Sequence, residues 1–391
     1  MTQTQGQAVS RYGLLRDRNF RTMLEYLAMQ GPHSRVELAE QLDLSQPSVS
    51  RMVDALLHSG LLQEGRRIAS KAGRRQTLLD INPRAAVVCG VSVRATFIRV
   101  TLADFKGNAI SRQSRERHPA SAEELVDQVR QMVTTELARL GLGTSLAGLA
   151  LGIPGVWDIT KQQVRAVPNV PELDGVDMLD LLKHSFSDMV HPEAVAVDNA
   201  VNYAAIGEGA YGVAMGCNDF FYLSIGSGAG GGLVIDNRVH QGFQGFGGEI
   251  GLLPVWSEGK LLPLEHLVSR SALVETSTGA GLGEDWEDLF RRAEGESEQA
   301  LEILAELSKF LAQAICAVTI LLNPQLVVLG GSVGRYSATL IPSIEMTTST
   351  LLPISPRIVA TTLGGDASIS GAVAHALELA RKSLVMREVM Q

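Results

Sequence analysis

The chain has 391 residues, of which 45% are hydrophobic and 19% are charged. This composition is typical of a globular protein, and the length allows two or three domains. It excludes intrinsic disorder over most of the chain. The 39 Gly residues follow no triplet period, which excludes a collagen-like array and indicates many tight turns instead.

Three further features concern location. No run reaches roughly 18 apolar residues, so we expect no membrane span. The N-terminal residues MTQTQGQAVSRYG lack the apolar core of a secretory signal. The three cysteines, Cys89, Cys217 and Cys316, are too widely spaced for a zinc cluster or a disulfide framework. We therefore expect a cytoplasmic protein.

Charge is unevenly distributed. Residues 1–83 carry 11 of the 34 Lys and Arg and 8 of the 42 Asp and Glu, a net charge of +3, so the rest of the chain carries a net −11. A basic N-terminal segment on an acidic body indicates that only this segment meets an anion, for which DNA is the natural candidate.

The N-terminal segment predicts three short helices. Apolar residues recur at helical spacing over residues 19–29. Ser34 and Glu37 form the pattern of a capping box before the second helix, and Ser45 caps the third. Gly60 then stands where a left-handed residue ends a helix. The second and third helices, joined by a tight turn, form a helix-turn-helix arrangement.

A cationic hairpin follows the third helix. Strands are expected to begin at Leu61-Leu62 and to return over residues 77–81. A plain three-helix bundle with a solvated polar face is the alternative, but the clustered cations favour a DNA-binding winged helix. The candidate DNA-binding residues are Gln46, Ser48, Ser50 and Arg51 on the third helix, and Arg66, Arg67, Lys71, Arg74 and Arg75 in the wing.

The body alternates predicted strands and helices, which indicates α/β architecture with ligands bound at the strand ends. Helices are expected over residues 122–140 and 298–322 and from residue 264 onward. Glycine-rich loops follow three of the strands, at residues 152–155, 226–232 and 330–332. The strands are expected within residues 87–102, 110–115, 147–153, 194–197, 220–225 and 325–329.

Six motifs, in order, resemble the ROK family of sugar kinases and sugar-responsive repressors. They are GIPGVWD, AVPNVPELDG, VDNAVNYAAIGE, LSIGSGAGGGLVIDNRVHQGFQGFGGEIG, LEHLVSRSAL and NPQLVVLGGSV. The resemblance implies an actin-like, two-lobed body behind the winged helix-turn-helix. We expect a DNA-binding domain over residues 1–82 and a body over 83–391, with lobe one at about 83–200 plus the C-terminal helix and lobe two at about 201–370.

The sequence departs from the family's kinases at two catalytic positions. Their first strand runs into a DxGGT phosphate loop, where this chain has Ser92-Val93-Arg94-Ala95-Thr96. Their ENDAN motif supplies an Asp as general base, and here Ala200 takes that place. Because a methyl group cannot accept a proton, we predict that the body is not an enzyme and needs no cofactor. Asp198 stands at the family's Glu position.

A third departure concerns zinc. Many members of the family bind zinc through one His and three Cys, whose positions here hold Leu252, Trp256, Glu258 and Pro263. These residues do not supply the ligand set that zinc prefers, so we predict no metal. Apolar packing by Leu252, Leu253, Trp256, Leu261 and Leu262 is expected to replace the zinc.

In contrast, the positions at which the family contacts its sugar keep polar residues. The resemblance places Asn169, Asn199, Glu249 and Glu265 where the family contacts sugar hydroxyls. Carboxylates and amides are suited to that task, although these residues could instead cap helices or brace loops. The loss of His at Leu252 removes one expected hydroxyl partner, so the effector can differ from glucose-type sugars.

The sequence thus predicts a transcriptional regulator, most plainly a repressor, whose body binds a sugar. Its expected partners are a double-stranded DNA operator, a sugar or sugar derivative, and further copies of the chain in a homodimer or homotetramer. The helix around residues 300–322 is one candidate interface. The alternatives are an active sugar kinase with a DNA-binding appendage and a constitutive DNA-binding protein with a vestigial pocket.

Overall fold

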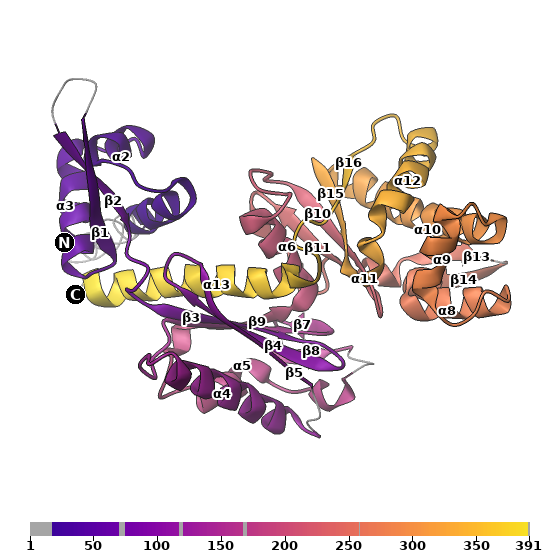
Figure 1. The fold of residues 1–391 in the computed structure, drawn as a ribbon, viewed down its shortest axis with the longest axis horizontal. Helices are drawn as coiled ribbons and strands as arrows, with labels where there is room; N and C mark the ends of the chain where they lie inside the picture. The colour runs from indigo at the N-terminus through magenta and orange to yellow at the C-terminus, as the bar shows by residue number, and fades with distance from the viewer. Residues whose placement is uncertain (1–17, 70–74, 117–119, 167–169, 258, 390–391) are drawn as a thin grey trace, which may run out of the picture.

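The computed structural model describes residues 18–69, 75–116, 120–166, 170–257 and 259–389. A small N-terminal head and two larger α/β lobes are joined by one long helix, α13 (Ala367–Leu384), which runs from between the lobes to the base of the head (Figure 1). The predicted fold class, a winged helix-turn-helix followed by a two-lobed α/β body, is confirmed.

The head contains a helix over residues 18–30, followed by two helices and a hairpin: α2 (Arg35–Gln41), α3 (Gln46–His58), β1 (Leu62–Ala69) and β2 (Arg75–Ile81). The predicted caps are confirmed. The Ser34 hydroxyl accepts from Glu37 N, and the Glu37 carboxylate accepts from Ser34 N at 2.8 Å. The Ser45 hydroxyl accepts from Ser48 N at the start of α3, and Gly60 has the left-handed φ of 74°.

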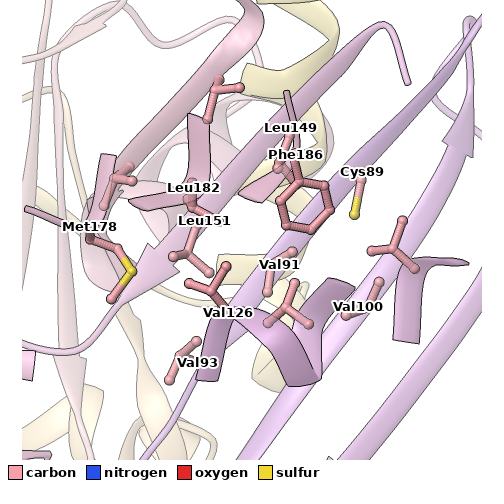
Figure 2. Packing of buried hydrophobic residues seen from close by; sticks show 14 of the residues in the cluster. Cys89, Val91, Val93, Val100, Val126, Leu149, Leu151, Met178, Leu182 and Phe186 are labelled. Carbon is pink, nitrogen blue, oxygen red and sulfur yellow. The ribbon is translucent and has the colours of Figure 1, made fainter. Parts of the chain in front are cut away.

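Lobe one is built on a sheet of order β5-β4-β3-β6-β9, in which β3 lies antiparallel to β4 and parallel to β6. The apolar stretch 87–102 lies in two strands because the chain turns at residues 94–96. Helices α4 and α5 cover one face, where Cys89, Val91 and Leu151 pack with Val126 and Phe186 (Figure 2). The elements are β3 (Val87–Val93), β4 (Phe97–Asp104), β5 (Ala109–Glu116), α4 (Ala122–Arg139), β6 (Gly148–Ile153), β7 (Val156–Asp158), β8 (Gln163–Arg165), η1 (Pro171–Leu173), α5 (Met178–Ser185), η2 (Pro192–Ala194) and β9 (Val195–Asn199).

Lobe two repeats this design with a sheet of order β12-β11-β10-β15-β16. Its core forms where the sheet packs against the helices, with α10 the longest of them. The elements are β10 (Phe220–Ile225), β11 (Ala229–Ile235), β12 (Arg238–Val239), η3 (Ile250–Leu252), β13 (Pro254–Ser257), β14 (Lys260–Pro263), α7 (Glu265–Val268), α8 (Arg270–Gly279), α9 (Trp286–Glu294), α10 (Glu298–Leu322), β15 (Leu326–Gly330), α11 (Gly331–Gly334), α12 (Ser337–Leu351), β16 (Arg357–Ala360) and η4 (Gly364–Asp366).

Helix α10 is long and apolar enough to cross a membrane by length and composition alone, with a mean hydropathy of 1.6 over its most apolar 18 residues. Inside the structure, however, 61% of that window is buried. The core helix of a globular lobe has the same properties, so α10 is weak evidence for a membrane span.

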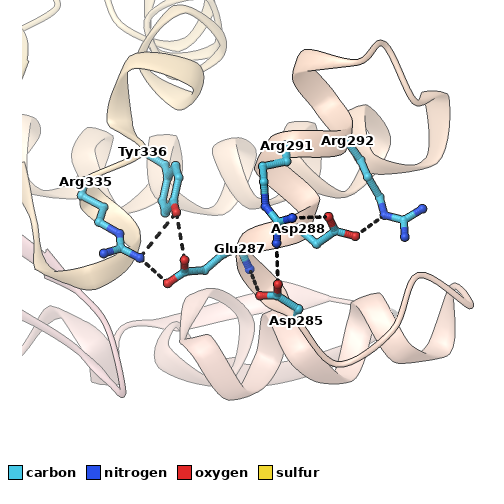
Figure 3. A network of polar contacts seen from close by, with 7 residues as sticks. All are labelled: Asp285, Glu287, Asp288, Arg291, Arg292, Arg335 and Tyr336. Atoms are coloured by element: carbon cyan, nitrogen blue, oxygen red, sulfur yellow. Dashed lines mark hydrogen bonds and ion pairs between the residues drawn. The ribbon is translucent and has the colours of Figure 1, made fainter.

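A polar network fixes α9 against the start of α12 (Figure 3). Glu287 accepts hydrogen bonds from the Arg335 guanidinium and, at 3.2 Å, from the Tyr336 hydroxyl. Phe290 stacks on the Tyr336 ring with centroids 4.3 Å apart. Because such exposed ion pairs contribute little stability, the stacking and burial of Phe290 are the stronger anchor.

The expected loop at residues 226–232 is shorter than predicted. Gly230, Gly231 and Gly232 belong to β11, which pairs with β10. A Cβ added at Gly232 would lie 2.6 Å from the Ala205 Cβ on α6 (Ala200–Tyr211). Glycine is therefore required there because helix α6 presses directly on the strand, and the sequence pattern alone could not separate this cause from a loop.

The predicted apolar replacement for zinc is wrong in detail. Leu252, at the end of η3, is 48% exposed. Trp256 and Leu261 are 68% and 55% exposed, because the antiparallel hairpin of β13 and β14 turns them toward solvent. The hairpin is held instead by its backbone pairs and by Val255, which is 3% exposed. Of the five expected packing residues, only Leu253 and Leu262 are partly buried.

The head shares an apolar core with lobe one. The cluster contains residues from the head, β3, β4 and α13, and it continues across the predicted boundary at residues 82 and 83. Beyond α13 the chain forms a short π-helix, Val385–Val389. The members of this cluster include Phe20, Leu24, Leu27, Leu79, Phe105, Leu377, Ala380 and Val385.

Candidate functional site

The end of strand β9 carries the predicted effector residues. Asn199 is the N-cap of α6, and its side-chain oxygen accepts from Val201 N at 2.7 Å. This leaves its Nδ2 free to donate to Glu249 Oε1 at 3.2 Å. Residues 50 positions apart in the sequence are thus brought together at the carboxyl edge of the lobe one sheet.

Glu249 faces a second carboxylate. Burial and the nearby charge of Glu265, at the start of α7, raise the Glu249 pKa to about 7, and the bond from Asn199 opposes that rise. A Cβ added at Gly228 would lie 3.0 Å from Glu265 Oε2, so the glycine loop borders this carboxylate. Two carboxyl groups and one amide therefore line one site. The fourth predicted member, Asn169, lies outside the described residues.

Asp198 has a positioning role. It is 5% exposed, and it accepts from Asn202 Nδ2 at 2.8 Å, Gln241 Nε2 at 2.8 Å and Asn199 N at 2.7 Å. Burial raises its pKa, while these donors oppose the rise. Because both oxygens already accept hydrogen bonds, Asp198 fixes the turn that carries Asn199 and is a poor candidate for a general base.

Gln241 is a site residue that the sequence analysis missed. The loop from Gln241 to Glu249 is tied at one end to Asp198 and at the other to Asn199. Within it, Gly247 N donates to Gln241 O at 2.8 Å. Phe243, at its tip, is 86% exposed. A glutamine eight residues before Glu249 gives no motif signal, so only the structure identifies it.

Metal binding finds no support in the described residues, where no group of three or more His, Cys, Asp or Glu could hold an ion. Leu252, Trp256 and Pro263 offer no ligand at the family's zinc positions, and Glu258 lies outside the part of the chain that the structure describes. Ala200, at the kinase base position, is the first residue of α6.

The head presents the predicted residues of α3. Gln46 and Arg51 are exposed, whereas Ser48 and Ser50 are half-buried. The Ser48 hydroxyl lies 2.8 Å from the Ser45 hydroxyl, so Ser48 also takes part in the helix cap.

The helix-turn-helix is braced by Arg35. Its guanidinium binds Asp54 at 2.7 Å and the Ser50 carbonyl at 3.2 Å, which fixes α2 against α3. The exposed face of α3 is thereby held in one orientation.

The wing projects from the head beside α3 (Figure 1). Arg66, Arg67 and Arg75 are exposed on its strands. Strand β1 has a register shift between Glu64 and Arg67, which bends the strand where the cations lie. Lys71 and Arg74 lie outside the described residues.

Comparisons with known proteins match the head and the body to two different families. The ROK family model matches residues 88–378, and the MarR family model matches residues 22–75. The xylose repressor of Bacillus spizizenii is 26% identical over 334 residues, covering 84% of this chain and 85% of that protein. The dual regulator NagC of Escherichia coli is 22% identical, covering 87% of each chain.

Solved structures show the same fold. A ROK family transcriptional regulator, described as a homolog of the E. coli MLC protein, superposes with a TM-score of 0.81 at 20% identity, covering 96% of this chain and all of that one. A ROK family glucokinase from Streptomyces griseus, solved with glucose and AMPPNP, gives a TM-score of 0.61 at 22% identity over 74% of this chain and 98% of that one. The chain belongs to the ROK family and carries a MarR-like winged helix-turn-helix in front of the ROK body.

Proposed function

We propose that this protein is a sugar-responsive transcriptional repressor whose ROK body binds a sugar and transfers no phosphate. The observation that carries the proposal is the bond between Asn199 and Glu249, which assembles hydroxyl-binding groups at the first turn of α6. Helix α6 packs along α13, and α13 enters the core of the DNA-binding head. Effector pocket and head are thus linked by two helices.

The pocket chemistry suits a polyol. A carboxylate such as that of Glu249 accepts from two adjacent hydroxyls, and the amide of Asn199 both donates and accepts. Glu265 adds a second acceptor, and we assign Asn169 to the same pocket from the family resemblance. A site built to pair buried hydroxyls rejects ligands that lack them.

We further propose that the head binds double-stranded DNA in the cytoplasm through α3 and the wing, and that two or more copies act together. Half-sites for such heads lie about 34 Å apart, or multiples of that spacing, so a small change in the relative placement of two heads weakens operator binding. A sugar can produce this change only if it binds one arrangement of the lobes more tightly than the other.

Phosphoryl transfer is disfavoured by the residues present. Ala200 offers no proton acceptor, and the oxygens of Asp198 are occupied by three donors. The turn at residues 94–96 has side chains where the family kinases have glycines. Two relatives, a xylose repressor and the dual regulator NagC, are regulators by name, which supports regulation rather than catalysis.

The test is a fluorescence anisotropy titration of the full chain against an operator that the chain itself selects from random DNA. Pentoses, hexoses, amino sugars and sugar phosphates are added in turn. At least one sugar should lower operator affinity ten-fold or more. Glu249→Gln should lose this response and keep its sugar-free operator affinity within two-fold. The control Glu302→Gln, on the exposed side of α10, should keep both the response and the sugar-free operator affinity.

Two results would redirect the proposal. Sugar-dependent ATP turnover well above background in a coupled assay would identify an active kinase with a DNA-binding appendage. If no sugar raises the melting temperature or releases DNA, the protein is a constitutive DNA-binding protein with a vestigial pocket.

A further inference from the structure

We propose that the turn between β4 and β5 clamps the DNA-binding head at a fixed angle to the body, and that Lys106 in this turn is a positioning residue for operator selection. The inference rests on the proposed function, because it concerns how two heads of an oligomer choose an operator. When each head is fixed on its body, the distance between the heads is set. The chain then distinguishes operators by the spacing of their half-sites.

The turn that carries Lys106 is stiffened by its own hydrogen bonds. The Asp104 carboxylate accepts from the backbone N of Lys106 and of Asn108, both at 2.9 Å, and from the Asn108 amide at 3.0 Å. Gly107 supplies the positive φ of 101°, which favours glycine, and its N donates to Asp104 O at 2.9 Å. A turn bonded in this way has little freedom of its own, so the side chains on it are held in place.

A side-chain contact and a backbone contact connect this turn to the end of the head. Lys106 Nζ lies 2.7 Å from Asp80 Oδ2 on β2, the wing strand that leads into the body. Phe105 N donates to Pro83 O at 3.1 Å, just beyond the end of β2. The Lys106 and Asp80 side chains are 31% and 17% exposed, so salt screens this pair less than an ion pair on the open surface. Asp80 is also fixed from its own side, since its Oδ1 accepts from Ile81 N at 2.8 Å.

The linker between head and body is itself bonded to the head. Residues 82–86 alone connect β2 to β3. The Asn82 amide donates to Gly60 O at 2.8 Å, beyond the end of α3, and its side-chain oxygen accepts from Arg84 N at 3.1 Å. Asn82 N donates to Leu61 O at 3.0 Å. The linker therefore continues the head and does not act as a flexible tether.

The same turn packs against both central helices. Phe105 is fully buried in the apolar cluster shared by head and body, and the Arg381 guanidinium carbon on α13 lies 5.8 Å from the centre of its ring. Arg381 also donates to Phe105 O at 3.4 Å. A Cβ added at Gly107 would lie 3.1 Å from the Tyr211 hydroxyl, at the end of α6, and 3.2 Å from Leu377 Cδ1 on α13. The turn thus contacts the head on one side and α6 and α13 on the other.

A rigid joint limits which operators both heads can bind at once. Successive base pairs are spaced ~3.4 Å apart, and each turns the duplex by about a tenth of a full rotation. Inserting two base pairs between the half-sites therefore moves one of them by roughly 7 Å and rotates it by about 70° around the duplex axis. Heads held at a fixed angle lose contacts after such a shift, whereas heads on loosened joints can follow it.

The experiment compares operators that differ only in half-site spacing. The full chain selects its operator from random DNA, and fluorescence anisotropy measures its affinity for that operator and for the same operator with two base pairs inserted between the half-sites. The native chain should bind the inserted operator about ten-fold or more weakly. Lys106→Met keeps the apolar stem and removes the charge, and Asp80→Asn removes the opposite charge. Each should reduce the native ratio of the two affinities by about three-fold or more.

A double variant and a matched control identify the cause. If the two residues act through their ion pair, the variant with both changes should resemble either single variant, because the second change has nothing left to remove. Lys161→Met, at an exposed lysine in the turn between β7 and β8, should keep the native ratio. Lys106→Met should also keep the native slope of log affinity against log salt, because Lys106 faces Asp80 and no phosphate. Melting temperatures verify that each variant is folded.

Each outcome decides between the proposals. If the native chain binds its operator but tolerates the inserted base pairs, or if either single variant keeps the native ratio, the clamp is refuted and DNA binding by the head stands. A selected operator with a single half-site, or summed effects in the double variant, refutes the clamp in the same way. A salt slope that falls by about one in Lys106→Met identifies a phosphate contact and also overturns the inference. If the chain selects no DNA, the proposed function itself fails.

Discussion

The Tyr203 hydroxyl on α6 and the His375 Nδ1 on α13 lie 3.2 Å apart where the two central helices pass each other. Their rings are 5.7 Å apart between centroids. Tyr203 is fully buried, and it lies one turn beyond Asn199, at the start of α6. This contact joins the helix that begins at the proposed effector site to the helix that ends in the head.

The first prediction concerns the packing of these helices. A Cβ added at Gly371 on α13 would lie 1.7 Å from the Tyr203 carbonyl oxygen and 2.8 Å from Gly207 N. Because both are backbone atoms, Gly371→Ala must push α6 and α13 apart. We expect the free energy of unfolding to fall by about 1–3 kcal/mol, and the sugar concentration needed to release DNA to change at least five-fold. Urea denaturation and anisotropy titrations measure the two effects.

Gly279→Ala is the control, since Gly279 is also a helical glycine, the last residue of α8, and nothing lies within 4 Å of its added Cβ. This variant should be neutral or slightly stabilised, by up to about 1 kcal/mol, with an unchanged sugar response. Equal behaviour of the two variants would show that the close contact of α6 and α13 does not carry the signal.

The second prediction concerns pH. The Glu249 pKa is raised from its ordinary 4.5 to about 7 by burial and by the charge of Glu265, so the folded protein keeps a proton that the unfolded chain releases. This contribution to stability is fully present below pH 4.5 and is lost as the pH rises through about 7. Glu249→Gln should therefore gain stability relative to the native chain between pH 5 and 8, by about 1–3 kcal/mol.

Urea denaturation at pH 5, 6, 7 and 8 measures this difference, and the other titrating groups cancel because both proteins contain them. Glu302→Gln on the exposed side of α10 should show no such trend. A stability difference for Glu249→Gln that is constant across the pH range would contradict a buried carboxyl at this position.

The third prediction concerns the DNA interface. Arg51 on α3 and Arg67 in the wing are both exposed and face no carboxylate that would neutralise them among the described residues. If each binds a phosphate, its replacement by Ala should weaken operator binding and lower the slope of log affinity against log salt by roughly one. Arg115→Ala, on the exposed strand β5 of lobe one, should leave both quantities unchanged. Unaltered slopes in both head variants would remove α3 and the wing from the phosphate contacts.

Much of the head could be predicted because its signals are local. The cap of α2 needs only Ser34 and Glu37, three residues apart, and the structure shows both bonds. The pairing of Asn199 with Glu249 is not local, and the ordered ROK motifs alone brought these residues together before the structure did.

The wrong predictions concern residues whose environment is decided by packing between elements far apart in the chain. Gly232 looks like a loop residue until α6 is seen to press on its strand. Trp256 and Leu261 are apolar and were expected in a core, yet a two-stranded hairpin that protrudes from lobe two exposes them. The role of Gln241 depends on its bond to Asp198 in another element, and no spacing in the sequence encodes that contact.

The last prediction concerns assembly. Ile320 and Leu321, at the end of α10, are 72% and 79% exposed, and Met346 and Leu351 on the adjoining helix α12 are 66% and 59% exposed. Exposed apolar side chains on neighbouring helices are typical of a protein interface, and we expect copies of the chain to meet here, at the interface predicted around residues 300–322. Leu321→Glu should therefore shift the full chain from a dimer or tetramer to a smaller species in light scattering after gel filtration. Met215→Glu, at a 63% exposed position away from these helices, should keep the native mass, and an unchanged mass for both variants would place the contact between copies elsewhere.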